Sequence, residues 1–425
     1  MFTISKLKEL SFLVYGLGLS GKSIVRFFIR NKIIKFKVWD DKEKKIYKKR
    51  QTSNLLQTLK DVDFIVLSPG ISLIDKKNLQ KFKKKIITDV DFFYLTNKVS
   101  KSIVVTGTNG KSTTSKIIYH LLKKNKFKVT LGGNIGTPLL DLKIKKDTYV
   151  VIELSSFQLS HSKFIKPDYA ILLNITNDHL DWHGSMLNYK NSKLKIFQLQ
   201  DKKQFSLINK KFEKNFKNKK FCGKLFLPNN KKYKYLKPRI KNPYFETSIN
   251  DENMGFVYTL SRLLKISEKN FTKAMETFRG LPHRYEIFLK IRNIIFVNDS
   301  KATSFEATKY ALLNSRNIYW ILGGLHKKND KISLMGLTKN IIKGYIIGKN
   351  SNYFKKQLKN KIDFAVPINL KNAIYQILSD IQSQNKNYNT ILFSPSAASF
   401  DQYLNFEKRG EEFKKLSKFY ARKFF

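Results

Sequence analysis

The chain has 425 residues, more than one ordinary domain holds, and 42% of them are hydrophobic, enough to build folded cores. The single cysteine, Cys222, excludes a disulfide framework and indicates a reducing, cytoplasmic setting, and no apolar run is long enough to span a membrane. A formal net charge of +50 indicates either a partner rich in phosphate or a compositional bias toward lysine. Lysine is spread along the whole chain without a basic tail or zinc-finger spacing, so we favour bias and expect no nucleic-acid partner.

The first part of the chain predicts a nucleotide-binding α/β domain. The strand-like run SFLVYGLGLSG contains Gly16, Gly18 and Gly21 in the spacing G-x-G-x-x-G, and the helical stretch KSIVRFFIRNK follows. Asp40 ends the next strand-like run, KFKVWD. This context is typical of a dinucleotide-binding turn. Because amides at a helix N-terminus bind any pyrophosphate, the identity of the nucleotide stays open.

The stretch SIVVTGTNGKSTTSKIIYHLL (residues 102–122) predicts a phosphate-binding loop between a strand and a helix. The common pattern G-x-x-x-x-G-K-[ST] would require glycine at Val105, whereas the glycines here are Gly107 and Gly110. Lys111 and Ser112 follow directly. Glycines let backbone amides face phosphate, the lysine reaches the β/γ oxygens, and the hydroxyl binds magnesium. The part of the pattern that contacts phosphate and magnesium, Gly110-Lys111-Ser112, is therefore retained.

Further polar residues follow two later strand-like runs. Glu153 lies at the end of TYVVIEL, where a carboxylate beside a phosphate loop suits magnesium. Asp178, His179, Asp181 and His183 follow YAILLNI, in a spacing that fits no standard zinc site. For Asp181 and His183 the default interpretation remains that they are solvent-facing loop residues. The lysine-rich part around 201–245 is expected to be irregular and peripheral.

A third segment begins near GLPHRYEIF (residues 280–288). Its strand-like runs NIIFVNDS, IYWILGG, GYIIG and TILFSPS all end in small or polar residues, and ligands of open α/β sheets lie at such ends. The chain thus predicts an α/β protein of three domains. These are a Rossmann-like domain at 1–98, a central P-loop domain with a mainly parallel sheet at 99–281, and a second Rossmann-like domain at 282–425.

Seven motifs in order resemble one family. They are GLGLSG (16–21), TGTNGKST (106–113), GGNIGTP (132–138), ELSSFQL (153–159), GLPHR (280–284), NDSKAT (298–303) and SPSAASFDQYLNFEKRG (394–410). The chain resembles the Mur ligase family, the ATP-dependent enzymes that build the peptide of peptidoglycan precursors, whose phosphate loop lacks the first glycine. The resemblance implies addition of D-glutamate to UDP-N-acetylmuramoyl-L-alanine through an acyl phosphate. It also implies that the protein uses ATP and two magnesium ions as cofactors and is a monomer.

The resemblance assigns roles residue by residue. It implies catalytic roles for Lys111, His179 and Lys193, with Lys193 carried as a carbamate. The implied magnesium ligands are Ser112, Glu153, His179 and the carbamate. The implied nucleotide contacts are Thr108, Asn109, Gly110, Lys111, Ser112, Thr113, Asn250, Asn253, Arg284 and Asp299. The implied UDP-sugar contacts are Leu19, Ser20, Asp40, Asp41, Gly70 and Asn134. The implied D-glutamate contacts, on the third domain, are Lys301, Thr303, Lys327, Ser399 and Phe406.

Four positions depart from the family pattern, and none of them removes a charged catalytic group. They are Asp41, Ile249, Ser304 and Leu325. Three alternatives remain open at this point: a sibling ligase that adds a different amino acid, a basic nucleic-acid-binding P-loop ATPase, and an NAD-dependent dehydrogenase.

Overall fold

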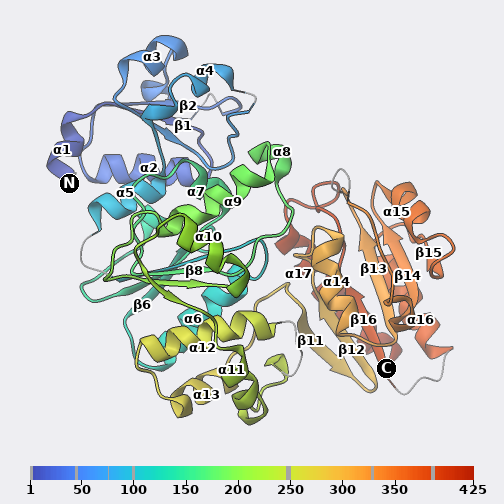
Figure 1. Ribbon diagram of the computed structural model, residues 1–425. Coiled ribbons are helices and arrows are strands. Elements are labelled where there is room, and N and C mark those ends of the chain that lie inside the picture. The colour runs from blue at the N-terminus through green and yellow to red at the C-terminus, as the bar shows by residue number, and fades with distance from the viewer. Residues whose placement is uncertain are drawn as a thin grey trace. The chain divides into compact units, whose positions relative to one another are not determined.

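The computed structural model describes residues 3–43, 46–74, 76–97, 101–245, 250–326, 330–383 and 388–425 (Figure 1). The chain forms two compact units, Met1–Glu246 with Asn250–Phe278, and Thr247–Ile249 with Arg279–Phe425. Helices and largely parallel sheets build both units, which confirms the predicted α/β class. The domain boundaries at 98/99 and 281/282 stay a prediction. No helix in the described ranges is long and apolar enough to cross a membrane.

The first unit contains a four-stranded parallel sheet in the order β2-β1-β3-β4. All four residues of β1 are buried, as expected for a parallel strand covered on both faces. Helix α2 presses Phe27 and Phe28 against Phe12 and Phe92 in a cluster of rings. The strands are β1 (Phe12–Tyr15), β2 (Phe36–Trp39), β3 (Phe64–Leu67) and β4 (Ile86–Ile87). The helices are α1 (Ile4–Glu9), α2 (Leu19–Arg30), α3 (Leu55–Asp61), α4 (Lys77–Gln80) and α5 (Asp89–Thr96).

The same unit contains a six-stranded parallel sheet in the order β10-β9-β8-β5-β7-β6. The strand before the phosphate loop, β5, lies between β8 and β7. The strands are β5 (Lys101–Thr106), β6 (Val129–Gly133), β7 (Tyr149–Glu153), β8 (Tyr169–Leu172), β9 (Phe205–Ile208) and β10 (Lys224–Phe226). The helices are α6 (Lys111–Lys124), α7 (Ser156–His161), α8 (Leu180–His183), α9 (Met186–Leu194), α10 (Glu213–Asn218), α11 (Asn230–Leu236), α12 (Asp251–Leu263) and α13 (Glu268–Glu276).

The expectation of an irregular stretch around 201–245 is wrong. β9 and β10 lie there and extend the sheet at its edge, paired in parallel with each other. Lysines at both ends of these short apolar runs conceal the strand pattern. On β10, the edge strand, such charge discourages pairing with other chains. The peripheral placement itself is right.

The second unit contains a sheet in the order β11-β12-β16-β13-β14-β15, parallel except for β11 against β12. The four strand-like runs predicted in this region form β12, β13, β14 and β16, and all six residues of β13 are buried. The strands are β11 (Glu286–Ile291), β12 (Ile294–Asn298), β13 (Ile318–Gly323), β14 (Ile341–Ile347), β15 (Phe364–Ala365) and β16 (Asn389–Phe393). The helices are α14 (Phe305–Leu313), α15 (Ser351–Leu358), α16 (Leu370–Gln382) and α17 (Phe406–Phe424).

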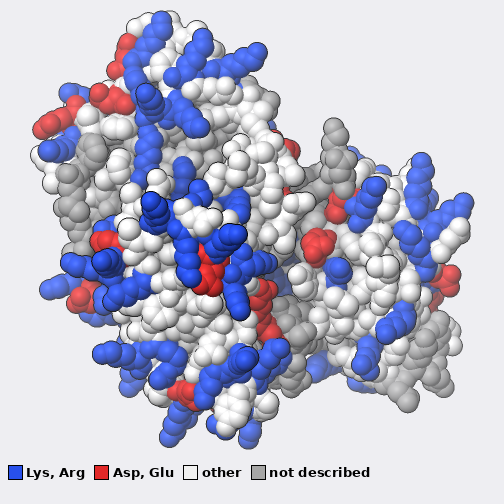
Figure 2. Space-filling model, in the orientation of Figure 1, with Lys and Arg blue, Asp and Glu red and all other residues white. Residues whose placement is uncertain are grey.

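Lysine and arginine side chains are spread over the visible face of both units (Figure 2). They do not gather into one patch on that face, which favours the compositional interpretation of the charge.

Candidate phosphate-binding site

Residues 107–110 form a tight loop between β5 and α6. Gly110 precedes the first residue of α6 and has a φ of +82°, a left-handed conformation that costs little only for glycine. A Cβ atom at Gly110 would lie 2.5 Å from Nδ2 of Asn253, on the first turn of α12. The structure therefore brings one of the predicted nucleotide residues, Asn253, directly against the loop.

Asn174 holds the loop in shape, although it is not among the residues predicted from the motifs. Its Oδ1 accepts hydrogen bonds from the backbone N–H groups of Thr108 (3.1 Å) and Asn109 (2.8 Å). Its Nδ2 donates to the Asn109 carbonyl at 3.1 Å, and its own carbonyl accepts from the Thr108 N–H at 2.9 Å. Asn174 follows β8, the neighbour of β5, so its position at a strand's carboxyl end is the signal that could have identified it.

Two lysine amines meet on one carbonyl of the loop. Lys111 Nζ donates to the carbonyls of Gly107 (2.9 Å) and Thr108 (2.7 Å). Lys193 Nζ, from α9, donates to the same Gly107 carbonyl at 2.7 Å. The Lys193 side chain is 1% exposed and its amine lies 4.7 Å from the centre of the Tyr189 ring. Predicted catalytic lysines from two distant parts of the chain are thus brought together.

Burial shifts the ionisation of Lys193. Burial, followed by the charge of Lys111, holds the pKa of Lys193 well below its usual range, although Asp178 and Glu153 act in the opposite direction. A buried amine with a lowered pKa carries a reactive lone pair in a larger share of molecules. Lys193 is therefore unlike the exposed lysines of this chain.

Glu153 has the features of a cation ligand. It ends β7, is 1% exposed, and accepts a hydrogen bond through Oε1 from Nδ2 of Asn134 at 2.8 Å. Its other oxygen, Oε2, is buried and has no hydrogen-bond partner among the described residues. Such an oxygen suits a bound cation, because an unpaired buried carboxylate oxygen is otherwise costly.

The donor set fits magnesium better than zinc. Across the described ranges, no three His, Cys, Asp or Glu side chains converge as a metal cluster. Magnesium requires only one or two carboxylates, with the remaining positions taken by water and phosphate oxygens. Ser112, 5% exposed in the first turn of α6, supplies the hydroxyl of the phosphate-loop pattern.

The two histidines after β8 have different surroundings. His179 precedes α8 with a φ of +54°, and its Nε2 lies 3.4 Å from Oδ2 of Asp178. His183 is buried, and its Nε2 lies 3.0 Å from Oγ of Ser156. The solvent-facing interpretation is thus wrong for His183, because the short helix α8 turns it inward, whereas Asp181 is exposed as expected.

Asp40 stabilises the glycine turn of the first sheet. Its Oδ2 accepts from the Leu17 N–H at 2.5 Å, and its Oδ1 accepts from the N–H groups of Lys42 (2.8 Å) and Glu43 (2.9 Å). Burial raises the pKa of Asp40, but these three bonds outweigh it, and the pKa lies below the usual value. Both carboxylate oxygens of Asp40 thus accept hydrogen bonds from backbone N–H groups of the turn.

Asp41 belongs to a polar network beside that turn. It accepts hydrogen bonds from the Tyr15 hydroxyl and the Trp39 indole, both at 3.0 Å, and forms an ion pair with Lys76 at 3.0 Å. The other predicted UDP-sugar residues near the turn vary in exposure. Leu19, the first residue of α2, is 81% exposed, whereas Gly70 has open space where a side chain would stand. Ser20, the second residue of α2, lowers the pKa of the buried Asp89, although burial raises that pKa to about 6.

The remaining predicted nucleotide residues lie on both units. Thr108 Oγ1 lies 2.9 Å from the Tyr189 hydroxyl, Thr113 is buried in α6, and Asn250 precedes α12. On the second unit, Asp299 accepts from the Ser394 hydroxyl at 2.7 Å. Asp299 also accepts from the Tyr285 N–H at 3.1 Å. Burial raises the pKa of Asp299 to about 7, although these two hydrogen bonds and the charge of Arg284 lower it.

Three of the predicted D-glutamate residues lie in loops after strands of the second unit's sheet, and a fourth begins a helix. Lys301 and Thr303 follow β12, Ser399 follows β16 and is buried, and Phe406 begins α17. The amine of Lys301 lies 3.8 Å from the centre of the Phe406 ring. Lys327, also predicted for this pocket, lies outside the described residues.

Comparison with known proteins identifies similar chains. Residues 105–272 match the model of the Mur ligase middle domain, and residues 10–90 match that of the Mur ligase MurD-like N-terminal domain. A UDP-N-acetylmuramoylalanine–D-glutamate ligase of Rickettsia felis is 35% identical, covering 95% of this chain and 96% of its own. One of Buchnera aphidicola subsp. Schizaphis graminum is 36% identical, covering 96% and 97%.

Solved structures show the same fold. A MurF ligase of Thermotoga maritima in complex with ADP superimposes with a TM-score of 0.57 at 16% identity, covering 98% of both chains. A UDP-N-acetylmuramate–alanine ligase of the same organism gives a TM-score of 0.54 at 16% identity, covering 96% of this chain and 99% of its own. At such low identity these likenesses concern the fold alone.

Proposed function

The chain belongs to the Mur ligase family, and we propose that it uses ATP to join D-glutamate to UDP-N-acetylmuramoyl-L-alanine in cytoplasmic peptidoglycan precursor synthesis. Relatives that match it over nearly their whole length carry the name of that reaction. The observation that carries the proposal is the meeting of Lys111 and Lys193 on the Gly107 carbonyl within the phosphate loop.

The reaction needs an activated carboxylate. The alanyl carboxylate attacks the terminal phosphorus of ATP, giving an acyl phosphate and ADP. The amine of D-glutamate then attacks the acyl carbon, and phosphate leaves as the amide forms. The first step brings two anions together, so a cation at the phosphates lowers its barrier.

Lys111 is the cation that the chain itself supplies. Its amine donates to the Gly107 and Thr108 carbonyls, at the mouth of the glycine turn where the terminal phosphates would bind. Exchange of those carbonyls for phosphate oxygens costs little, because one set of acceptors replaces another. Backbone N–H or hydroxyl groups of the loop and of the first turn of α6 would donate hydrogen bonds to the same phosphates, from Asn109, Gly110, Ser112 and Thr113.

Glu153, Ser112 and His179 would hold magnesium, which when bound neutralises charge on the phosphates. The buried Oε2 of Glu153, which has no hydrogen-bond partner among the described residues, supports this assignment. Asn134, which donates to the other oxygen, would orient the carboxylate, as partners of metal ligands commonly do.

We further propose that Lys193 is carbamylated. A neutral buried amine can attack carbon dioxide, and loss of the amine proton then leaves a carbamate anion. That anion would bind the second magnesium ion and would remove the repulsion between Lys193 and Lys111. Activity of the wild-type enzyme should fall in carbon dioxide-depleted buffer and recover with bicarbonate. Full activity of Lys193→Ala at subsaturating magnesium would refute the assignment.

The remaining predicted residues are proposed to bind the other substrates. D-glutamate carries two carboxylates, which cations and hydroxyl donors recognise. The proposed D-glutamate contacts are Lys301, Thr303, Lys327, Ser399 and Phe406. The proposed UDP-sugar contacts are Leu19, Ser20, Asp40, Asp41, Gly70 and Asn134. Asn250, Asn253, Arg284 and Asp299 are proposed to bind the nucleotide.

One experiment tests the function. Phosphate release is measured with ATP, magnesium, UDP-N-acetylmuramoyl-L-alanine and each of several amino acids in turn, and the product is weighed by mass spectrometry. We expect release with D-glutamate alone. Release with another amino acid would indicate a sibling ligase instead. Release that needs no amino acid and rises with RNA or DNA would indicate a nucleic-acid-dependent ATPase.

A further inference from the structure

Two aromatic rings stack at the carboxyl edge of the second unit's sheet. The ring of His326, just after β13, lies face to face with the ring of Tyr353 on α15, with centres 3.9 Å apart and planes inclined by 6°. His326 follows the Gly323-Gly324-Leu325 turn, and α15 follows β14, the strand beside β13. The stack therefore joins a loop of one strand to the helix of the next.

The same turn is held on its other side by backbone hydrogen bonds. The Leu325 N–H donates to the Ala398 carbonyl at 3.0 Å, and the Ala398 N–H donates back to the Leu325 carbonyl at 2.9 Å. The Gly323 N–H donates to the Pro395 carbonyl at 2.9 Å. Ser399, in the proposed D-glutamate pocket, is the residue after Ala398 and is 2% exposed.

The turn thus connects α15 to the proposed pocket. A displacement of His326 would act through Leu325 on Ala398, the residue that precedes Ser399. Gly324 leaves little freedom, because a Cβ atom there would lie 2.4 Å from the Ala398 carbonyl oxygen. Close packing of this kind transmits strain, because it leaves little space to absorb a shift.

We infer that His326 and Tyr353 are positioning residues, which through their ring stack hold the 323–326 turn so that Ser399 is set for D-glutamate. The inference rests on the proposed function. Neither ring is assigned contact with the substrate. The Tyr353 hydroxyl is buried and makes no hydrogen bond to any described residue, so the ring face and not the hydroxyl carries the role.

Single and double variants test the pair. Tyr353→Ala and His326→Ala should each raise KM for D-glutamate about three- to ten-fold. That factor corresponds to the interaction free energy of one aromatic pair. KM for ATP and kcat should change less than two-fold. Tyr353→Phe keeps the stack and should match the wild type. The double variant should be no worse than either single variant, because the second substitution removes a ring that has already lost its partner.

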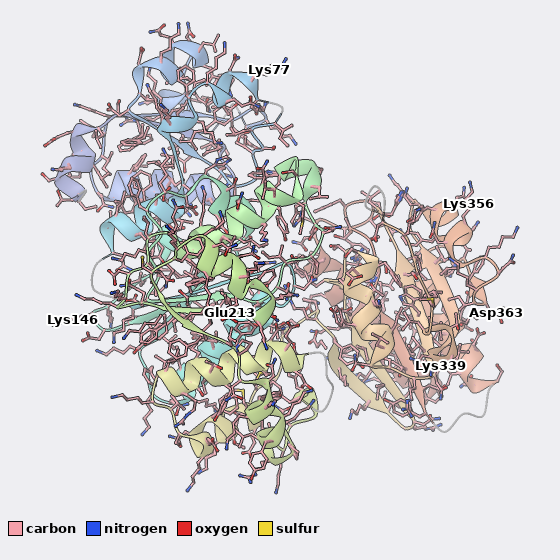
Figure 3. All side chains as sticks on the ribbon, in the orientation of Figure 1. Lys77, Lys146, Glu213, Lys339, Lys356 and Asp363 are labelled. Atoms are coloured by element: carbon pink, nitrogen blue, oxygen red, sulfur yellow. The ribbon has the colours of Figure 1, made fainter. Side chains whose placement is uncertain are left out.

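Two controls separate positioning from general loss of structure. Lys356→Ala alters the exposed face of α15 (Figure 3), and Tyr375→Ala removes a half-exposed tyrosine from α16. Both should keep the wild-type KM for D-glutamate. Because His326 is partly exposed, His326→Ala keeps the test valid if Tyr353→Ala fails to fold.

The outcomes are distinct. If wild-type enzyme releases phosphate with D-glutamate and the two alanine variants keep its KM, the positioning role is overturned while the function stands. Additive effects in the double variant would also overturn it. If wild-type enzyme shows no release with D-glutamate, the proposed function and the positioning role fall together.

Discussion

Replacement of Asn174 by alanine should loosen the phosphate loop. The Thr108 N–H keeps the Asn174 backbone carbonyl at 2.9 Å, so the loss concentrates on Asn109. Asn109 loses the acceptor of its N–H at 2.8 Å and the donor to its carbonyl at 3.1 Å. An N–H left without a partner in a partly buried site costs about 1–3 kcal/mol.

This cost should appear in both stability and ATP use. A loss of about 1 kcal/mol lowers the melting temperature by roughly 2–4 °C in a domain of about 150–250 residues, and we expect a shift of about 2 °C or less in this longer chain. The loosened loop must regain its shape when it binds phosphate. If that costs about 1.4 kcal/mol of binding free energy, KM for ATP rises about ten-fold. Scanning fluorimetry and phosphate release at varied ATP measure the two effects.

Asn174→Asp provides a sharper comparison. The carboxylate keeps an acceptor for both N–H groups but loses the donor to the Asn109 carbonyl, and it adds a negative charge beside the phosphates. We expect Asn174→Asp to melt closer to wild type than Asn174→Ala and yet to bind ATP less tightly. Asn125→Ala is the control, because its Nδ2 donates to the Leu121 carbonyl at the far end of α6. Wild-type KM for ATP in both Asn174 variants would refute the role of this residue.

Three further predictions concern the same region. Gly110→Ala should cost about 1–2 kcal/mol from its left-handed backbone and abolish the stabilisation of the protein by ATP in a melting assay; unchanged stabilisation would contradict the loop geometry. Glu153→Gln should raise the magnesium concentration needed for half-maximal phosphate release at least about ten-fold, since it removes one anionic ligand; an unchanged requirement would exclude Glu153 as a ligand. Burial, with smaller contributions from neighbouring positive groups, lowers the pKa of His161 and of His183 to about 4. The unfolded chain therefore takes up these protons first, so their contribution to stability is full above about pH 6.5 and is lost as pH falls toward 4. His161→Gln and His183→Gln should each flatten the fall in melting temperature over that range, and an unaltered slope would exclude the residue concerned.

The order of motifs along the chain indicates much of the site. The glycine, lysine and serine of the loop identify a phosphate site, because only a few residue types bring amides, a cation and a hydroxyl to phosphate. Apolar runs that end in small or polar residues predict the strands of both units. The runs that form β9 and β10 are too short and too rich in lysine to be recognised in this way.

Sequence determined the residue types that meet phosphate and the α/β class, because glycine spacing and apolar periodicity are local properties of the chain. Only the tertiary structure brings Lys193 onto the same carbonyl as Lys111, 82 positions earlier in the chain, and buries it. Only the tertiary structure leaves one oxygen of Glu153 without a partner among the described residues and sets Asn174 against the loop. Burial, pKa and hydrogen-bond satisfaction depend on what packs around a side chain, and parallel strands bring distant residues to one edge of a sheet.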